Sequence, residues 1–403
     1  MLDFNKSLEY SANLVNSLGM SKLSNGKTLA KTLTLNRIPF WDIFAVELAR
    51  IYIPSELTKE VENSHISTKI KNTLIKKRYG FRDFINKHYS RKDRLSSPLD
   101  SFLCLDFSDH MSRDVLNPVV SHLTEQMGNK VVSIRDRPWG NSLTCSNPNS
   151  SYKTIWDYWN VEVAKEVSSL KRELSDIINY LKTSDDLKTI VRTNESSLWP
   201  KLENVFNRFF DAELPNLISI GVLAKHIIEK HTPKLVISAD VADPRSRAFI
   251  LLCKQIGIPC IEIQFGLAGA EATEWQFFSA NKVAVWGLDA KKTMINHGIK
   301  KEDIIITGSP RHDNLINVDK DEGNVIRKKL KIPESSYIVL LASAYQTQEY
   351  DSFSDPQLLY DMKRSIFEAA DKSTNIVLVV KPHPTENVKE TKSIAGKNKN
   401  IKF

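Results

Sequence analysis

Polar, cationic and small residues follow five apolar runs of the sequence, at the points where strands are expected to end. They are Asp240, Asp243, Arg245 and Arg247; Gln264, Phe265 and Gly266; Gly308, Ser309, Arg311 and Asp313; Ser343; and Lys381, His383 and Thr385. Open α/β sheets bind ligands beyond the carboxyl ends of their strands. Small residues, backbone amides and several cations at such an edge predict a site for a phosphate-bearing ligand.

Among these candidates, His383 is the hardest to explain by local structure. It lies between two prolines, after a lysine, at the end of a run that should be a buried strand. The prolines fix the backbone, and functional residues concentrate on such loops, so we expect a functional histidine. The other candidates have structural alternatives: helix capping for Asp240 and Asp243, a surface ion pair for Arg247 or for Arg311 with Asp313, and a tight turn for Gly266 and for Gly308–Pro310.

Several well-known catalytic and binding motifs are missing from the sequence. The other eight histidines have no metal-ligand spacing, and there is no H-E-x-x-H. There is no Walker A loop, no G-x-S-x-G, and no G-x-G-x-x-G after the first strand. The sequence therefore predicts no metal site and disfavours a dinucleotide-dependent dehydrogenase.

The elements that must position these residues alternate between strand and helix. Continuous Val, Ile and Leu runs predict strands at 101–107, 130–134, 235–238, 260–264, 283–286, 304–307, 337–342 and 376–380. Helical spacing predicts helices at 116–127, 245–256, 290–297, 324–330 and 356–370, with several more within 152–230. Residues 33–53 suggest a strand and then a short buried helix. This alternation is typical of parallel sheets covered on both faces.

Length and charge set further bounds. The chain has 403 residues, 41% of them hydrophobic and 26% charged, and a net charge of +8. This length corresponds to about two to three domains, and the apolar content excludes a disordered chain. Residues 69–94 contain ten basic and two acidic residues, which account for the whole net charge. The rest of the chain is neutral, which argues against a general nucleic-acid binder.

The cysteines and the N-terminus indicate a cytoplasmic protein. Cys104, Cys145, Cys253 and Cys260 form no C-x-x-C pair, and three of them lie in or beside apolar runs. Buried thiols of this kind fit a reducing compartment. No signal-peptide core and no apolar stretch of about 18 residues is present. We expect a cytoplasmic enzyme, which could also work at the inner face of the membrane.

Four short segments, in order, resemble one family of enzymes. They are residues 263–266 (IQFG), 283–287 (VAVWG), 306–313 (ITGSPRHD) and 380–384 (VKPHP). The series resembles the GT-B-type transferases of surface polysaccharide synthesis. These include capsular polysaccharide glycosyltransferases, CDP-glycerol glycerophosphotransferases and, more distantly, UDP-N-acetylglucosamine 2-epimerases. The resemblance covers residues 230–403, with weaker support from 100–135.

The resemblance implies a role for each matched residue. His383 would contact the donor phosphate, stabilising the leaving group with Lys381 and Arg311. Asp240 would be the general base for an acceptor hydroxyl. The implied donor-binding residues are Arg247, Gln264, Gly266, Gly308, Ser309, Arg311, Ser343, Lys381 and Thr385. Phe265 replaces the usual histidine of a Q-H-G turn. No cofactor is implied; the substrate would be a UDP-, CMP- or CDP-linked donor, and the acceptor a saccharide or a lipid-linked molecule.

The implied fold has two Rossmann-like doubly wound domains. We expect a mostly helical accessory region at 1–97, a first domain at 98–316 with a helical insertion at 150–230, and a partial second domain at 317–403. Only two clear strands and one clear helix follow residue 337, so the second domain looks truncated, and much of the family's nucleotide site would lie beyond Phe403.

Two other functions are also compatible with the sequence. One is an epimerase or hydrolase acting on a UDP-sugar with the same fold. The other is a non-catalytic α/β protein that binds membrane or nucleic acid. The basic segment has three interpretations: a solvated helical surface, a membrane-docking patch through Lys76, Lys77, Arg78 and Arg82, and, least favoured, a nucleic-acid site.

Overall fold

The computed structural model describes residues 4–54, 101–136, 147–195, 199–267, 272–317, 320–343, 356–383, 386–396 and 398–403. The chain divides into two compact units, Met1–Asp313 and Asn314–Phe403, which we call unit 1 and unit 2. The expected membrane-docking residues Lys76, Lys77, Arg78 and Arg82 lie outside the described residues, as do Thr385 and Cys145. Within the described residues, no helix is both long and apolar enough to span a bilayer.

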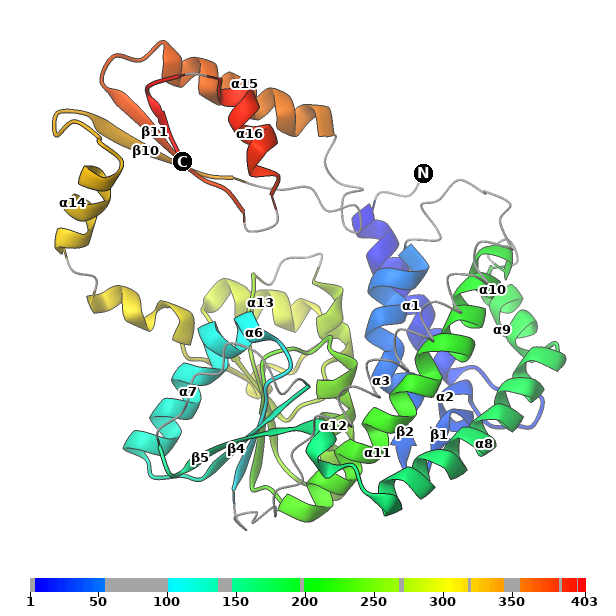
Figure 1. The fold of residues 1–403 in the computed structure, drawn as a ribbon. Helices are drawn as coiled ribbons and strands as arrows, with labels where there is room; N and C mark the ends of the chain where they lie inside the picture. Colours follow the sequence, from blue (N-terminus) through cyan, green and yellow to red (C-terminus); the bar gives the residue numbers. More distant parts are fainter. Residues whose placement is uncertain are drawn as a thin grey trace. The chain divides into compact units, whose positions relative to one another are not determined.

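A seven-stranded parallel sheet forms the centre of unit 1 (Figure 1). Its strands are β3 (Phe102–Leu105), β4 (Val131–Arg135), β5 (Ser150–Thr154), β6 (Leu235–Ser238), β7 (Cys260–Ile263), β8 (Lys282–Val285) and β9 (Ile304–Ile306). Their order is β5-β4-β3-β6-β7-β8-β9. The order reverses between β3 and β6, which is the switch point where doubly wound folds bind ligands.

Helices cover both faces of this sheet. The described helices of unit 1 are α1 (Phe4–Met20), α2 (Leu29–Thr32), α3 (Phe40–Glu47), α6 (Asp109–Met111), α7 (Asn117–Ser121), α8 (Val161–Thr183), α9 (Asp186–Glu195), α10 (Trp199–Arg208), α11 (Leu214–His231), α12 (Pro244–Ile256) and α13 (Leu288–Asn296). Short π-helical or 3₁₀ turns join them: η1 (Leu48–Tyr52), η2 (Ser112–Leu116), η3 (His122–Gln126), η4 (Ile155–Tyr158), η5 (Phe209–Glu213), η6 (Thr273–Phe277), η7 (Lys301–Asp303) and η8 (Pro310–Asn317).

Alternation along β3 shows how the two faces are filled. Leu103 and Leu105 belong to the large core with α11 and α12, whereas Cys104 packs with the helical segment 112–121 on the other face. Successive side chains of a strand point to opposite faces, so a strand covered on both sides is apolar throughout. The predicted α/β class with a doubly wound parallel sheet is confirmed.

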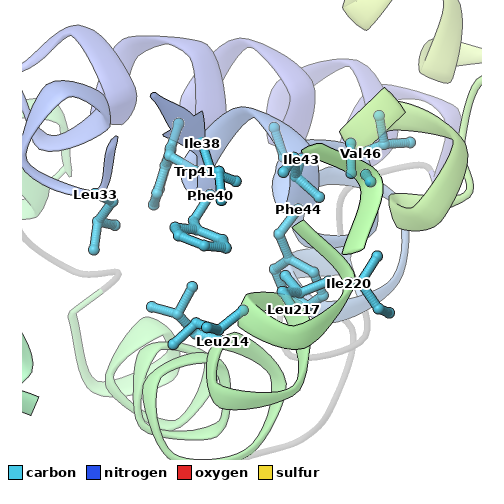
Figure 2. Packing of buried hydrophobic residues seen from close by; sticks show 14 of the residues in the cluster. Leu33, Ile38, Phe40, Trp41, Ile43, Phe44, Val46, Leu214, Leu217 and Ile220 are labelled. Carbon is cyan, nitrogen blue, oxygen red and sulfur yellow. The ribbon is translucent and has the colours of Figure 1, made fainter. Parts of the chain in front are cut away.

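The N-terminal residues pack in the same core as α11. A short hairpin, β1 (Thr34–Leu35) and β2 (Ile38–Pro39), leads into α3. Figure 2 shows Ile38, Phe40 and Phe44 facing Leu214, Leu217 and Ile220. A Cβ atom added to Gly221 would lie 2.7 Å from the Ile38 side chain, so glycine permits this close approach. The described part of the expected accessory region, residues 4–54, therefore belongs to unit 1.

Unit 2 is a smaller α/β layer. Three parallel strands, β10 (Tyr337–Ala342), β11 (Ile376–Lys381) and β12 (Ile401–Lys402), lie in the order β10-β11-β12. The helices are α14 (Lys320–Lys329), α15 (Pro356–Asp371) and α16 (Val388–Ala395). Phe367 of α15 and Leu378 of β11 belong to its small core.

Two sequence-based expectations differ from the structure. The run 337–342 was expected to be a buried strand, but Tyr337 is 68% exposed and Leu340 61%. Strand β10 has a neighbour on one side only among the described residues, so its apolar side chains are covered less. The second difference is the polar strand β5, which overlaps the start of the region 152–230 where helices are expected. It is a half-buried edge strand without an apolar pattern, which hides it from sequence.

Candidate functional site

The switch point of unit 1 contains a small pocket beyond the ends of β3 and β6. Its lining includes Phe107, Ser108, Met111, Asp240 and Ser246, and its volume is about 10 Å³. This is room for about one water molecule. The predicted catalytic residue Asp240 therefore lies at the position where doubly wound sheets bind their ligands.

Asp240 is held firmly by the turn that it begins. Its Oδ1 accepts hydrogen bonds from the backbone N–H groups of Ala242 at 3.0 Å and Asp243 at 3.1 Å. Burial, and then the neighbouring charge of Asp243, raise the pKa of Asp240 to about 6. At neutral pH the side chain is a carboxylate, yet a more basic one than an exposed aspartate. This combination is suited to general-base catalysis. The N-cap of α12 is Asp243, whose Oδ1 accepts the Arg245 N–H at 2.7 Å.

Two arginines neutralise the remaining carboxylates around this crevice. Arg245 donates to Asp136 at 2.8 Å and pairs with Asp243 through two side-chain nitrogens. Arg135 donates to Asp106 at 2.6 Å. Both cations are thus paired with carboxylates of the protein. The surroundings of Asp240 suit a neutral hydroxyl-bearing acceptor better than a phosphate.

Arg247, a predicted donor-binding residue, is 4% exposed and joins three chain segments. Its guanidinium donates to the carbonyl oxygens of Asp42 at 2.8 and 3.0 Å, of Phe277 at 2.8 Å and of Val241 at 3.4 Å. These contacts support a structural role for Arg247. This role differs from the surface ion pair that is the structural alternative in the sequence analysis. We therefore leave Arg247 out of the proposed site.

Gln264 ties together the ends of β7 and β8. Its Oε1 accepts the Trp286 N–H at 2.8 Å, and its Nε2 donates to the Gly266 carbonyl at 2.9 Å. The neighbouring Phe265 packs its ring against His110, with centroids 5.2 Å apart. Gln264 shapes this turn, and the exposed Gly266 continues it.

The end of β9 contributes Gly308, Ser309 and Arg311. Gly308 has φ +78°, a conformation that favours glycine. Ser309 is 8% exposed, and its hydroxyl has no hydrogen-bond partner among the described residues. Arg311 is half exposed and lies 3.6 Å from Asp114, so part of its guanidinium is open to solvent. Of these three residues, Arg311 is the one suited to an anionic ligand.

Unit 2 brings the other predicted residues together at one sheet edge. Strands β10 and β11 are adjacent and parallel, with Ala342 opposite Lys381. Ser343 therefore lies beside the start of the Lys381–His383 turn, and its N–H donates to the Lys381 carbonyl at 3.0 Å. This turn combines a cation with a half-buried histidine, as a phosphate site requires.

Glu386, which the sequence analysis did not identify, organises this edge. Its Oε1 accepts from Lys363 at 2.7 Å, Ser343 at 2.9 Å and Thr391 at 2.5 Å, and its Oε2 accepts the His383 N–H at 3.0 Å. Burial opposes its ionisation, yet these hydrogen bonds, led by that from Lys363, hold its pKa at about 2. A permanent carboxylate thus fixes the backbone of His383.

A second residue that we did not identify is Glu262, in the middle of β7. Its side chain is 1% exposed, and burial, followed by the charge of Asp240, raises its pKa to about 8. The only sequence signal for it was an acidic residue inside an apolar strand run. The sequence signal for Glu386 was weaker still, because its side-chain partners come from three separate segments.

A scan against protein families gives one match. Residues 288–403 match the family described as CDP-Glycerol:Poly(glycerophosphate) glycerophosphotransferase. This segment contains α13, β9 and all of unit 2, with Lys381, His383 and Glu386. The glycerophosphotransferase resemblance inferred from the sequence is thereby confirmed over that segment, and the family that matches is a family of transferases, as predicted.

Several solved structures are distantly similar to this chain. The UDP complex of S. aureus MnaA has 13% identity and a TM-score of 0.45, covering 76% of this chain and 68% of that one. A putative UDP-N-acetylglucosamine 2-epimerase from Listeria monocytogenes has 14% identity and a TM-score of 0.44, with the same coverage. A variant of the wall teichoic acid polymerase TagF has 10% identity and a TM-score of 0.38, covering 85% and 70%. No curated protein matches the sequence.

Proposed function

We propose that the protein transfers a polyol phosphate from a CDP-activated donor to a hydroxyl group of a cell-surface polymer or lipid-linked acceptor. The observation that carries this proposal is the family match over residues 288–403, which include the Lys381–His383 turn. The sugar transfer considered from the sequence needs the same donor chemistry, but the matched family favours a phosphate-linked polyol.

The donor diphosphate is assigned to the strand ends of unit 2. The reaction expels a nucleoside monophosphate, on which negative charge builds up in the transition state. Lys381 and His383 stabilise that charge by electrostatic attraction and hydrogen bonding. Glu386 holds the His383 main chain at 3.0 Å, so the histidine is positioned before the donor binds. The role of Arg311 in donor binding stays a prediction from the sequence.

The acceptor hydroxyl is assigned to Asp240. Its carboxylate takes the hydroxyl proton while the acceptor oxygen forms a bond to the transferred phosphorus. The bond between that phosphorus and the bridging oxygen of the diphosphate breaks, and CMP leaves with the electron pair. A base with a pKa of about 6 is ionised at neutral pH, as this role requires.

We also propose that the reaction takes place in the cytoplasm, at the inner face of the membrane. A nucleotide donor and buried thiols fit the cytoplasm, and a lipid-linked acceptor would place the enzyme at the inner face of the membrane. The basic residues Lys76, Lys77, Arg78 and Arg82 are proposed to dock there. Changing Lys76, Lys77 and Arg78 to glutamate should reduce co-sedimentation with anionic liposomes, and unchanged binding would refute the patch.

The main test measures transfer from radiolabelled CDP-glycerol to a glycerol-phosphate polymer by the full chain. His383→Ala should lower turnover by about 10²–10⁴-fold, whereas the exposed His122→Ala should leave it unchanged. Equal turnover of wild type and His383→Ala would remove His383 from the mechanism. If the wild type transfers nothing from CDP-glycerol but converts UDP-N-acetylglucosamine to its 2-epimer, the epimerase alternative is correct.

A further inference from the structure

Glu262 lies in β7, the strand next to β6, which leads to Asp240. Strands β6 and β7 are parallel neighbours, and their register places Ser238 opposite Glu262. The Ser238 hydroxyl bonds to the Glu262 carboxyl. The same Ser238 oxygen accepts the backbone N–H of Asp240 at 3.2 Å. One serine thus connects a fully buried carboxyl group to the main chain of the proposed base.

The other charged groups around Glu262 leave it without a full counter-ion. Asp240, beyond the end of β6, is a like charge. Arg247 of α12 attracts Glu262, but its donors are bonded to carbonyl oxygens, and Asp42 of α3 lies on its other side. The Glu262 Oε2 atom has no hydrogen-bond partner among the described residues.

Such a carboxyl group destabilises the fold whenever it is ionised. Burying an unpaired charge is unfavourable by several kcal/mol, and a neutral side chain of the same shape would avoid that penalty. A buried acid in this position, linked to a ligand pocket, therefore points to a functional role.

We propose that Glu262 is a positioning residue for the transfer: it holds the Asp240 main chain through Ser238, and the two carboxyl groups carry a single negative charge between them. Asp240 carries that charge and accepts the proton of the acceptor, while Glu262 remains neutral. Both groups have raised pKa values, and the charge of Asp240 is one of the causes of the rise at Glu262, as in a coupled pair. The mechanistic part of this proposal rests on the proposed function.

The first test follows the pair without any activity. The infrared difference spectrum between the full wild-type chain and Glu262→Gln should contain the band of a protonated carboxyl group at pH 7. Glu47, whose pKa burial also raises to about 8, is present in both proteins and cancels in the difference. In Asp240→Asn this signal should titrate at lower pH than in the wild type, because the charge that holds the proton on Glu262 is gone. An unchanged titration midpoint in Asp240→Asn, or a difference spectrum without the protonated-carboxyl band, would overturn the pairing.

The second test uses the pH dependence of kcat/KM. The wild type should gain activity as Asp240 ionises and lose it as Glu262 ionises, because two like charges then repel each other and displace the Asp240 carboxylate. One pH unit above the Glu262 midpoint, this loss should reach about tenfold. Glu262→Gln should keep the acid limb and lose the alkaline one.

Two outcomes separate the inference from the proposed function. An alkaline limb unchanged in Glu262→Gln would show that the role of Glu262 is structural only. A wild type that transfers nothing from any nucleotide donor would refute the proposed function, while the infrared result would still decide the pairing. If Glu262→Gln does not fold, Ser238→Ala provides the second variant. It leaves both carboxyl groups in place, and the proposal expects lower kcat with unchanged donor binding.

Discussion

The strand ends of the two units treat their carboxyl groups in opposite ways. In unit 1, burial and a nearby carboxylate raise the pKa of Asp240 to about 6, and burial raises that of Glu262 to about 8. In unit 2, Glu386 is also buried, with 4% of its side chain exposed, yet its pKa is held at about 2. The Glu386 carboxylate receives four hydrogen bonds, one of them from a lysine. The number and charge of the donors, more than burial itself, decide whether a carboxyl group becomes a base or a fixed anion.

The largest effect should come from removing the Asp240 carboxylate, the proposed general base. Asp240→Asn should lower turnover by about 10²–10⁴-fold, because the amide cannot accept the acceptor's proton. Donor binding, measured by calorimetry with CDP-glycerol, should stay the same. The exposed Asp289→Asn on α13 is the matched control and should retain full activity. Turnover in Asp240→Asn equal to that of the control would assign the base elsewhere.

The second largest effect should be a loss of stability when the Glu386 carboxylate is removed. Glu386→Ala leaves Lys363 buried without its partner at 2.7 Å, which should destabilise the protein by about 3–5 kcal/mol. Denaturant unfolding of the full chain measures this difference, with the exposed Glu334→Gln as control. A loss no larger than in the control would mean that the four hydrogen bonds contribute little.

The Glu386 network also sets a pH dependence. The folded-state pKa of Glu386 is lowered from 4.5 to about 2, so its stabilisation is present above about pH 4.5 and is lost as the pH falls through about 2. Glu386→Gln should remove this acid-dependent part of the unfolding curve.

The buried acid of unit 1 should give the opposite sign. Because the folded-state pKa of Glu262 is raised from 4.5 to about 8, the unfolded chain loses its proton first and stability falls between these values. The slope should be at most about 1.4 kcal/mol per pH unit. Glu262→Gln should melt with the wild type near pH 4 and above it near pH 8. A constant difference between the two melting temperatures at all pH values would contradict this account.

The smallest effect concerns the backbone of the turn that follows β9. Gly308 has φ +78°, so Gly308→Ala should destabilise unit 1 by about 1 kcal/mol. Gly266 has no positive φ and open space around its Cβ position, so Gly266→Ala is the matched control with no expected loss. Thermal unfolding distinguishes the two variants, and equal melting temperatures would argue against strain at Gly308.

The sequence was sufficient for the elements with strong local patterns. The expected strands at 235–238 and 337–342 coincide with β6 and β10, and the expected helix at 245–256 differs from α12 by one residue. The clustering of Ser343 with Lys381 and His383 followed from the rule that parallel strands end at one edge.

Features that depend on distant partners could not be predicted from local sequence patterns. Glu386 accepts hydrogen bonds from Lys363 and Ser343, which lie 23 and 43 positions away. Arg247 binds the carbonyl oxygens of Asp42 and Phe277 across 205 and 30 positions respectively. Neither pattern leaves a local trace. The exposure of β10 likewise depends on which strands lie beside it, and no periodicity within the strand reports that.

The Arg247 contacts also have a consequence for how the chain is made. Ribosomes release the N-terminus first, but the aromatic cluster around Phe40 and Phe44 packs against α11, some 170 residues later. The Phe277 carbonyl oxygen, which also accepts a hydrogen bond from Arg247, leaves the ribosome later still. The first helices must therefore wait, with apolar surface uncovered, until most of unit 1 has left the ribosome. A nascent chain of this design depends on chaperones during synthesis more than one whose early segments fold by themselves.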